Sequence, residues 1–217
     1  PENTNFVLGP INKPRWIYSC AKQMMDRVIH AYGQEQGLSY TLFRPFNWIG
    51  SGLDSFNTSK EGSSRVITQF FGNIARGEPI KLVDGGFQRR SFTDVYDGTN
   101  ALIKIIENKN NIADGKIYNI GNPFNDLSIK DLAVAMLEMA KTFPEYKNHA
   151  SKVKIIEITS KDYYGEGYQD MQKRVPSIKN TQIDLDWSPT ISFDESLKKI
   201  FNAYKNDILS AAKTLQD

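Results

Sequence analysis

The sequence has little cysteine, little histidine and almost no net charge. Of its 217 residues one is a cysteine, Cys20, and two are histidines, His30 and His149. A single cysteine excludes an internal disulfide, and these three residues lack the spacing of a metal site, so no metal is expected. Lys and Arg total 27 against 25 for Asp and Glu. Without a long basic stripe, a nucleic-acid partner bound by bulk charge is not expected either.

Long apolar runs are also absent. No run approaches the roughly 20 residues that a membrane-spanning helix needs, and no signal peptide opens the chain, so we expect no membrane partner and a cytoplasmic location. The chain starts at Pro1 in a polar stretch, which suggests a piece of something longer. Its 40% hydrophobic and 12% aromatic residues suit a globular core. With no repeat and no linker, residues 1–217 are expected to form one compact unit.

Hydrophobic periodicity predicts alternating helices and strands. The first helix is expected at about residues 15–36, where apolar side chains recur at helical spacing, followed by a strand at 38–43 and a loop at 46–62. Further helices are predicted at 65–75 (capped by Ser63 or Ser64), 95–108, 129–141 (capped by Ser128), 179–185 and 193–209. Further strands are predicted at 79–83, 89–92, 116–120 and 153–158, with a turn at 84–86 and a loop at 163–170. This alternation is typical of an α/β fold.

The spacing of Tyr18 and Lys22 in the first helix is chemically informative. Residues four apart lie on one helix face, so the ammonium of Lys22 can sit close to the phenol of Tyr18. A tyrosine has a reference pKa of about 10, and a neighbouring cation lowers that pKa by stabilising the phenolate. Such a pair can act as a general base for a hydroxyl while a hydride leaves the adjacent carbon. Taken alone, the same spacing also occurs as ordinary surface chemistry.

A second motif, Arg44-Pro45-Phe46-Asn47-Trp48-Ile49-Gly50, follows the predicted helix and strand. Together with Tyr-x3-Lys, it resembles the extended short-chain dehydrogenase/reductase family in its sugar-nucleotide branch. Similar stretches follow in family order at 77–81, 84–86, 90–95, 118–123, 173–178 and 186–189. The resemblance implies the C-terminal part of such an enzyme: a Rossmann-like sheet remnant plus a small substrate-binding subdomain, with substrate-binding elements at about 46–92 and 116–217.

The resemblance also implies NAD as cofactor. No G-x-G-x-x-G turn, which holds the pyrophosphate in this class, occurs in the sequence. Tyr18 also lies too near the start to be preceded by the Ser or Thr and the Glu that partner it in the family. We therefore expect the N-terminal dinucleotide-binding half to be absent, and this chain alone to bind NAD poorly and to have little or no activity.

Within the family, the stretches 12–19, 43–50, 62–65 and 163–170 resemble the ArnA-type UDP-glucuronate decarboxylases, found in bifunctional polymyxin-resistance proteins. By position, the resemblance assigns catalysis to Tyr18, Lys22 and Arg174, and cofactor contacts to Tyr18, Lys22, Pro45 and Phe46. It assigns substrate binding to Asn47, Arg65, Lys81, Tyr168 and Arg174. An arginine suits the glucuronate end because its planar guanidinium forms paired, charge-assisted hydrogen bonds with a carboxylate; a surface arginine in a polar loop is the plainer interpretation.

The function predicted from these residues is NAD-dependent oxidative decarboxylation of UDP-glucuronic acid to a UDP-4-keto-pentose. Oxidation of the 4-hydroxyl gives a β-keto acid, which loses CO2 because the new ketone accepts the electrons. A UDP-xylose synthase, a UDP-sugar 4-epimerase of the same family and a non-catalytic UDP-sugar-binding module are alternatives. A homo-oligomer is expected to form through the Tyr-Lys helix, with Met24, Met25 and Ile29 in the contact.

Overall fold

The computed structural model describes residues 8–13, 16–53, 64–166, 168 and 170–214. Its helices are α1 (Trp16–Gln36), α2 (Val66–Arg76), α3 (Val95–Glu107), α4 (Ile129–Lys141), α5 (Pro144–Ala150), α6 (Ser160–Tyr164), α7 (Lys179–Leu185) and α8 (Phe193–Thr214). Its strands are β1 (Leu42–Pro45), β2 (Trp48–Ile49), β3 (Ile80–Val83), β4 (Arg89–Ser91), β5 (Thr93–Asp94), β6 (Ile117–Ile120), β7 (Asp126–Ser128), β8 (Ile155–Ile158) and β9 (Lys173–Arg174). Within these ranges, no helix combines the length and apolar character needed to cross a membrane.

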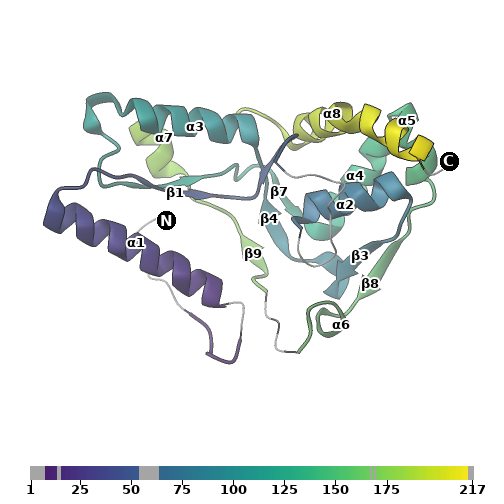
Figure 1. Ribbon diagram of the computed structural model, residues 1–217, viewed down its shortest axis with the longest axis horizontal. Coiled ribbons are helices and arrows are strands. Elements are labelled where there is room, and N and C mark those ends of the chain that lie inside the picture. Colours follow the sequence, from purple (N-terminus) through teal and green to yellow (C-terminus); the bar gives the residue numbers. More distant parts are fainter. Residues whose placement is uncertain (1–7, 14–15, 54–63, 167, 169, 215–217) are drawn as a thin grey trace.

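The strands form short, mainly parallel ladders, which confirms the α/β class. β1 pairs with β6, β2 with β5 and β3 with β8, all in parallel. β4 lies between two neighbours, antiparallel to β7 and parallel to β9, with Arg90 opposite Arg174 in the second pairing. In Figure 1 the ladder containing β1 runs between α1 on one side and α3 with α7 on the other.

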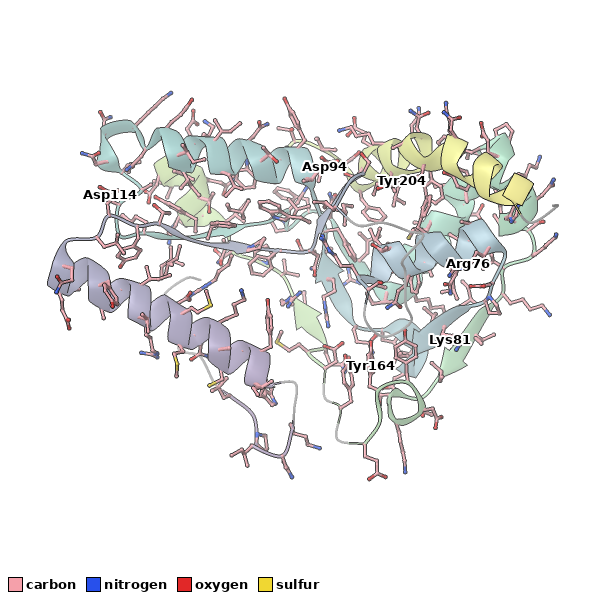
Figure 2. All side chains as sticks on the ribbon, in the orientation of Figure 1. Arg76, Lys81, Asp94, Asp114, Tyr164 and Tyr204 are labelled. Carbon is pink, nitrogen blue, oxygen red and sulfur yellow. The ribbon has the colours of Figure 1, made fainter. Side chains whose placement is uncertain are left out.

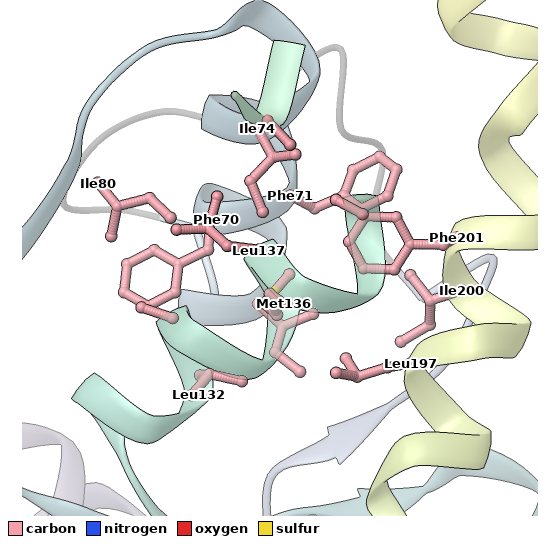
Figure 3. Close-up of a cluster of buried hydrophobic side chains, with 14 of the residues drawn as sticks. Phe70, Phe71, Ile74, Ile80, Leu132, Met136, Leu137, Leu197, Ile200 and Phe201 are labelled. Atoms are coloured by element: carbon pink, nitrogen blue, oxygen red, sulfur yellow. The ribbon is translucent and has the colours of Figure 1, made fainter. Parts of the chain in front are cut away.

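Two separate hydrophobic clusters hold these elements. The larger one lies among α2, α4, α5, α8 and β3; Figure 3 shows Phe71, Met136 and Phe201 in it. It forms because α2 repeats apolar residues at helical spacing. These residues lie on one face of the helix, and that face is buried in the cluster. Burying each large apolar side chain contributes about 1.5–3 kcal/mol. The smaller cluster joins α3, α7 and β6 around Tyr118 and Trp187.

Most predicted elements are confirmed, with boundaries shifted by a few residues. α7 coincides with the prediction, and Ser128 caps α4 as expected, its Oγ accepting from the backbone N–H of Asp131 at 2.9 Å. The strand predicted at 38–43 lies instead at Leu42–Pro45, because its hydrogen-bonding partner β6 begins only at Ile117.

Other predictions were wrong in detail. Ser64 does not cap α2: the N-cap residue is Arg65, and it makes no side-chain cap, while Ser63 lies outside the described residues. The expected loop at 46–62 contains β2, which pairs with β5 through a contact between distant segments. The expected loop at 163–170 begins inside α6, whose first turn is capped by Thr159. Four further elements were not predicted from the sequence: α5, β5, β7 and β9.

None of the residues of helix α1 is buried. Asp26 pairs with Arg44 of β1 at 3.2 Å, and Nδ1 of His30 lies 2.7 Å from the hydroxyl of Tyr40. Met24 and Met25 are exposed, whereas Ile29 lies on the half-buried row that includes Asp26. The three residues predicted for the oligomer contact therefore do not share one face of the helix.

Candidate active site

A cavity of about 330 Å³ lies between the start of α2, strands β3 and β4, and the segment around α6. Four of the predicted substrate residues line it: Asn47, Arg65, Lys81 and Tyr168. They come from segments far apart in the sequence, and the fold brings them to one cavity. Tyr18, Lys22, Pro45, Phe46 and Arg174 are not among the residues that line it.

Asn47 connects the cavity to Arg174. Its backbone has a φ of 38°, in the left-handed region that asparagine tolerates better than most residues. Its Nδ2 donates to the carbonyl of Ser91 at 2.7 Å, and its Oδ1 accepts from Nη2 of Arg174 at 2.8 Å. The guanidinium of Arg174 is thus joined by a hydrogen bond to a residue that lines the cavity.

The motif around Asn47 also depends on a close approach at Gly121. A Cβ added to Gly121 would lie 2.6 Å from the ring of Pro176 and 2.9 Å from Cβ of Phe46. A side chain at this position would therefore push Phe46 away from the end of β6. Phe46 is half-buried and Pro45 is exposed.

Arg65 and Lys81 supply positive charge to the lining. Arg65 donates to the carbonyls of Trp48 at 3.1 Å and Leu53 at 3.4 Å, so it also holds the loop after β2 against the start of α2. Lys81 is half-buried on β3. Cations of this kind bind phosphate oxygens through charge-assisted hydrogen bonds.

Arg90 and Asp170 line the same cavity and were not predicted as site residues. Nη2 of Arg90 donates to Oδ1 of Asp170 at 2.7 Å, and its Nη1 donates to the carbonyl of Met171 at 2.8 Å. A signal was present in the sequence, because two consecutive arginines in a strand point to opposite faces and one must turn inward. Which of the two does so depends on the segments that pack against each face of the strand.

Aromatic side chains form one wall of the cavity. Tyr164 and Tyr168 stack with ring centres 3.8 Å apart, and Tyr163 meets Tyr164 edge-on at 4.6 Å. The hydroxyl of Tyr163 donates to Oε1 of Gln69 at 3.0 Å. Burial, followed by the proximity of Tyr168, raises the pKa of Tyr164 above its ordinary value, so the phenol of Tyr164 stays neutral. Figure 2 labels Tyr164 and Lys81, which both line the cavity.

Tyr18 and Lys22 lie on one face of α1, as their spacing predicts. Nζ of Lys22 is 5.6 Å from the centre of the Tyr18 ring, and the Tyr18 side chain is 68% exposed. In Figure 1 the N-terminal end of α1, which carries both residues, is directed toward β9, where Arg174 lies. The structure therefore pairs the phenol with the amine on an open surface outside the cavity.

Comparison with known proteins identifies this architecture. Residues 1–121, more than half of the chain, match the model of the NAD dependent epimerase/dehydratase family. The chain belongs to this family. The PbgP3 protein from Burkholderia pseudomallei is 55% identical over 97% of this chain and 59% of its own, with a TM-score of 0.84.

Two other solved proteins share the fold at lower sequence identity. The UDP-glucuronic acid 4-epimerase from Bacillus cereus, solved with UDP-glucuronic acid and NAD, is 18% identical over 95% of this chain, with a TM-score of 0.70. The UDP-glucose 4-epimerase from Thermotoga maritima, solved with UDP-glucose, is 20% identical over 96% of it, also at 0.70. The chain spans 59% and 60% of these two proteins, less than two-thirds of each.

NAD is the cofactor of the epimerase/dehydratase family, and the residues present fit one end of it. The phenol of Tyr18 and the ammonium of Lys22 are exposed on one helix face. Both groups can form hydrogen bonds with the hydroxyls of a ribose of NAD. The pyrophosphate end requires a glycine-rich turn between a strand and a helix, and the 217 residues contain no G-x-G-x-x-G.

Proposed function

We propose that the protein containing this chain catalyses NAD-dependent oxidative decarboxylation of UDP-glucuronic acid to a UDP-4-keto-pentose. The observation that carries the proposal is the 2.8 Å hydrogen bond between Arg174 and Asn47. It joins a guanidinium to a residue that lines a cavity already supplied with cations and aromatic rings. A sugar acid linked to a nucleoside diphosphate has anionic groups at both ends, and this arrangement offers cations for each.

The diphosphate end is assigned to the cavity. Arg65 and Lys81 provide positive charge for the phosphate oxygens, and Asn47 provides an amide that reaches the same space. The stacked Tyr164 and Tyr168 offer a flat, neutral surface beside them, against which a planar base or a sugar ring can pack. Tyr168 is proposed to face the glucuronate end together with Arg174.

The chemical steps are assigned to Tyr18, Lys22 and Arg174. Bound NAD supplies the acceptor for the hydride that leaves C4 of the sugar. Tyr18 takes the proton of the 4-hydroxyl, and Lys22 stabilises the phenolate that must be present beforehand. The bond from C5 to the carboxylate then breaks, CO2 leaves, and the electron pair moves onto the new C4 ketone as an enolate. Arg174 positions the carboxylate and helps to return a proton to C5.

The same residues are compatible with related reactions, which differ in their products. A UDP-xylose synthase returns the hydride and releases UDP-xylose, whereas a 4-epimerase retains the carboxylate. A non-catalytic module would bind UDP-sugars without turnover. The proposal of decarboxylation is favoured by the stretches 12–19, 43–50, 62–65 and 163–170, which resemble the ArnA-type decarboxylases, together with the hydrogen bond between Arg174 and Asn47.

The test is product analysis on the protein expressed from its own start codon. It is incubated with UDP-glucuronic acid and NAD+, absorbance reports NADH, and mass spectrometry reports the sugar nucleotide. The proposal expects NADH and a ketopentose in equal amounts, with one CO2 for each. UDP-xylose without net NADH, an epimerised sugar acid, or binding without turnover would each replace it with the corresponding alternative.

We also propose a homo-oligomer in which α1 packs against a second copy. Exposed apolar side chains on the outer side of this helix support the contact: Ile17, Met24, Met25, Val28 and Tyr32. Such a contiguous apolar row on a helix surface typically marks an interaction site.

A further inference from the structure

Strand β4 carries two arginines with matched acidic partners. Arg89 pairs with Asp126, with Nε 3.0 Å from Oδ2, and Arg90 pairs with Asp170, with Nη2 2.7 Å from Oδ1. Both aspartate side chains are 17% exposed. The arginines are neighbours in a strand and point to opposite faces. Arg90 and Asp170 line the cavity, and Arg89 and Asp126 do not.

Asp170 differs in charge from the other ionic residues around the cavity. Among the described lining residues, Arg65, Lys81 and Arg90 are cationic and Asp170 is the one carboxylate. Its Oδ1 accepts from Arg90 and also from the backbone N–H of Met171 at 2.7 Å. A carboxylate so placed uses guanidinium hydrogens that a phosphate oxygen would otherwise use, because both anions bind the same planar group.

We propose that Asp170 is a built-in counter-ion that competes with the substrate's diphosphate for Arg90 and thereby limits the affinity of the cavity for anionic ligands. The inference rests on the proposed function, since it takes the ligand to be a nucleoside diphosphate. In the empty cavity Asp170 neutralises Arg90, whose side chain is only 10% exposed. An unpaired charge at that depth would destabilise the fold.

When the ligand binds, a phosphate oxygen takes the place of the carboxylate on Arg90, so the guanidinium is paired in both states. The carboxylate must then tolerate a second anion nearby, which weakens binding. Substrate and product carry the same diphosphate, so the weakening applies to both and favours release of product. Asp170 is therefore an affinity-setting residue of the site, and it takes part in no bond-making step.

The test measures binding of UDP to the full chain by calorimetry at low and high salt, with Asp170→Asn compared to Asp126→Asn. These variants make the same charge change on two aspartates of equal exposure. Asp170→Asn is expected to bind UDP roughly tenfold more tightly at low salt, with the gain shrinking at high salt. Asp126→Asn should stay within about twofold of the wild type, because its partner faces away from the cavity.

Uridine, which has no phosphate, separates charge competition from a change in cavity shape. Its affinity, measured by ligand-observed NMR, should be equal in the wild type and Asp170→Asn. Asp170→Ser repeats the removal of charge with a smaller side chain, and thermal unfolding checks that each variant is folded. UDP binding that is unchanged or weaker in both Asp170 variants overturns the inference, as does an equal gain for uridine. If the wild type binds no UDP at all, the proposed function fails first and the inference with it.

Discussion

Arg174 and Asn47 are 127 positions apart in the sequence, and a 2.8 Å hydrogen bond joins Nη2 of the first to Oδ1 of the second. Asn47 is fixed in turn by its bond to the carbonyl of Ser91 and by β2, which begins one residue later. The guanidinium therefore has a defined position beside a residue that lines the cavity, as recognition of a carboxylate requires.

Replacing Arg174 tests that recognition. Arg174→Gln is expected to weaken binding of UDP-glucuronic acid roughly tenfold or more, because a charge-assisted hydrogen bond to the carboxylate is lost. Binding of UDP-glucose, which has no carboxylate, should change little. Calorimetry with both ligands provides the measurement, and Lys173→Gln, the exposed neighbour on β9, is the control. Equal losses for the two sugars would contradict the assigned role.

Replacing Tyr18 tests the proposed base. Tyr18→Phe should lower turnover by about a hundredfold or more while leaving the affinity for UDP unchanged, because the residue lies outside the cavity. Tyr32→Phe is the matched control: it lies on the same helix, is 58% exposed, and has Gln36 instead of lysine four positions later. Steady-state NADH formation by the protein expressed from its own start codon provides the readout. Similar rates for the two variants would remove Tyr18 from the mechanism.

Glu195 gives α8 a pH-dependent cap. The backbone N–H of Ser192, and then its hydroxyl, donate to Oε2 of Glu195 at 2.9 and 2.8 Å, and they lower the pKa of this carboxyl from 4.5. Because the folded-state pKa is the lower one, this contribution to stability is present above about pH 4.5 and is lost as the pH falls through the folded-state value.

The free energy of unfolding of the wild type should therefore fall more steeply than that of Glu195→Gln below about pH 4.5. Urea titrations at a series of pH values provide the measurement. Ser192→Ala, which keeps the backbone donor and removes the hydroxyl, should show an intermediate slope. Parallel curves for all three proteins would show that the cap does not act through the charge of Glu195.

The larger hydrophobic cluster depends on Phe201. Its ring is fully buried and lies 5.1 Å, centre to centre, from the rings of Phe71 and Tyr146. Phe201→Ala should lower the free energy of unfolding by about 3–5 kcal/mol, as measured by denaturant titration. Phe124→Ala, at a side chain that is 80% exposed, should have almost no effect. A small loss of unfolding free energy in Phe201→Ala would mean that the cluster repacks to fill the space left by the ring.

A charge introduced among the exposed apolar side chains on the outer side of α1 should prevent the proposed homo-oligomer from forming. Met24→Glu places a charge in the row and should convert an oligomer to monomers in analytical ultracentrifugation. Ile183→Glu, at an exposed position on α7, should leave the molecular mass unchanged. A wild type that is already monomeric at micromolar concentration would end the oligomer proposal.

Local features of the fold could be predicted because their causes are local. The cap at Ser128 and the apolar repeat of α2 involve residues within one or two helical turns of each other, and both elements appear where the sequence indicates. The Ser192 and Glu195 pair has the spacing of a capping box, so it too could have been found. Elements such as β2, β7 and β9 could not, because strands of two or three residues exist only through pairing with distant segments.

For the site, the amino-acid order by itself determined that Tyr18 and Lys22 share a helix face, because helical geometry places residues four apart together. It also supplied the resemblance that singled out Asn47, Arg65, Lys81 and Tyr168. Only the tertiary structure decided which of two adjacent arginines turns into the cavity and which aspartate, 80 positions later, meets it. Strand alternation makes the two arginines opposite, but the segments that pack on each face of the β4 ladder set which of the two lines the cavity.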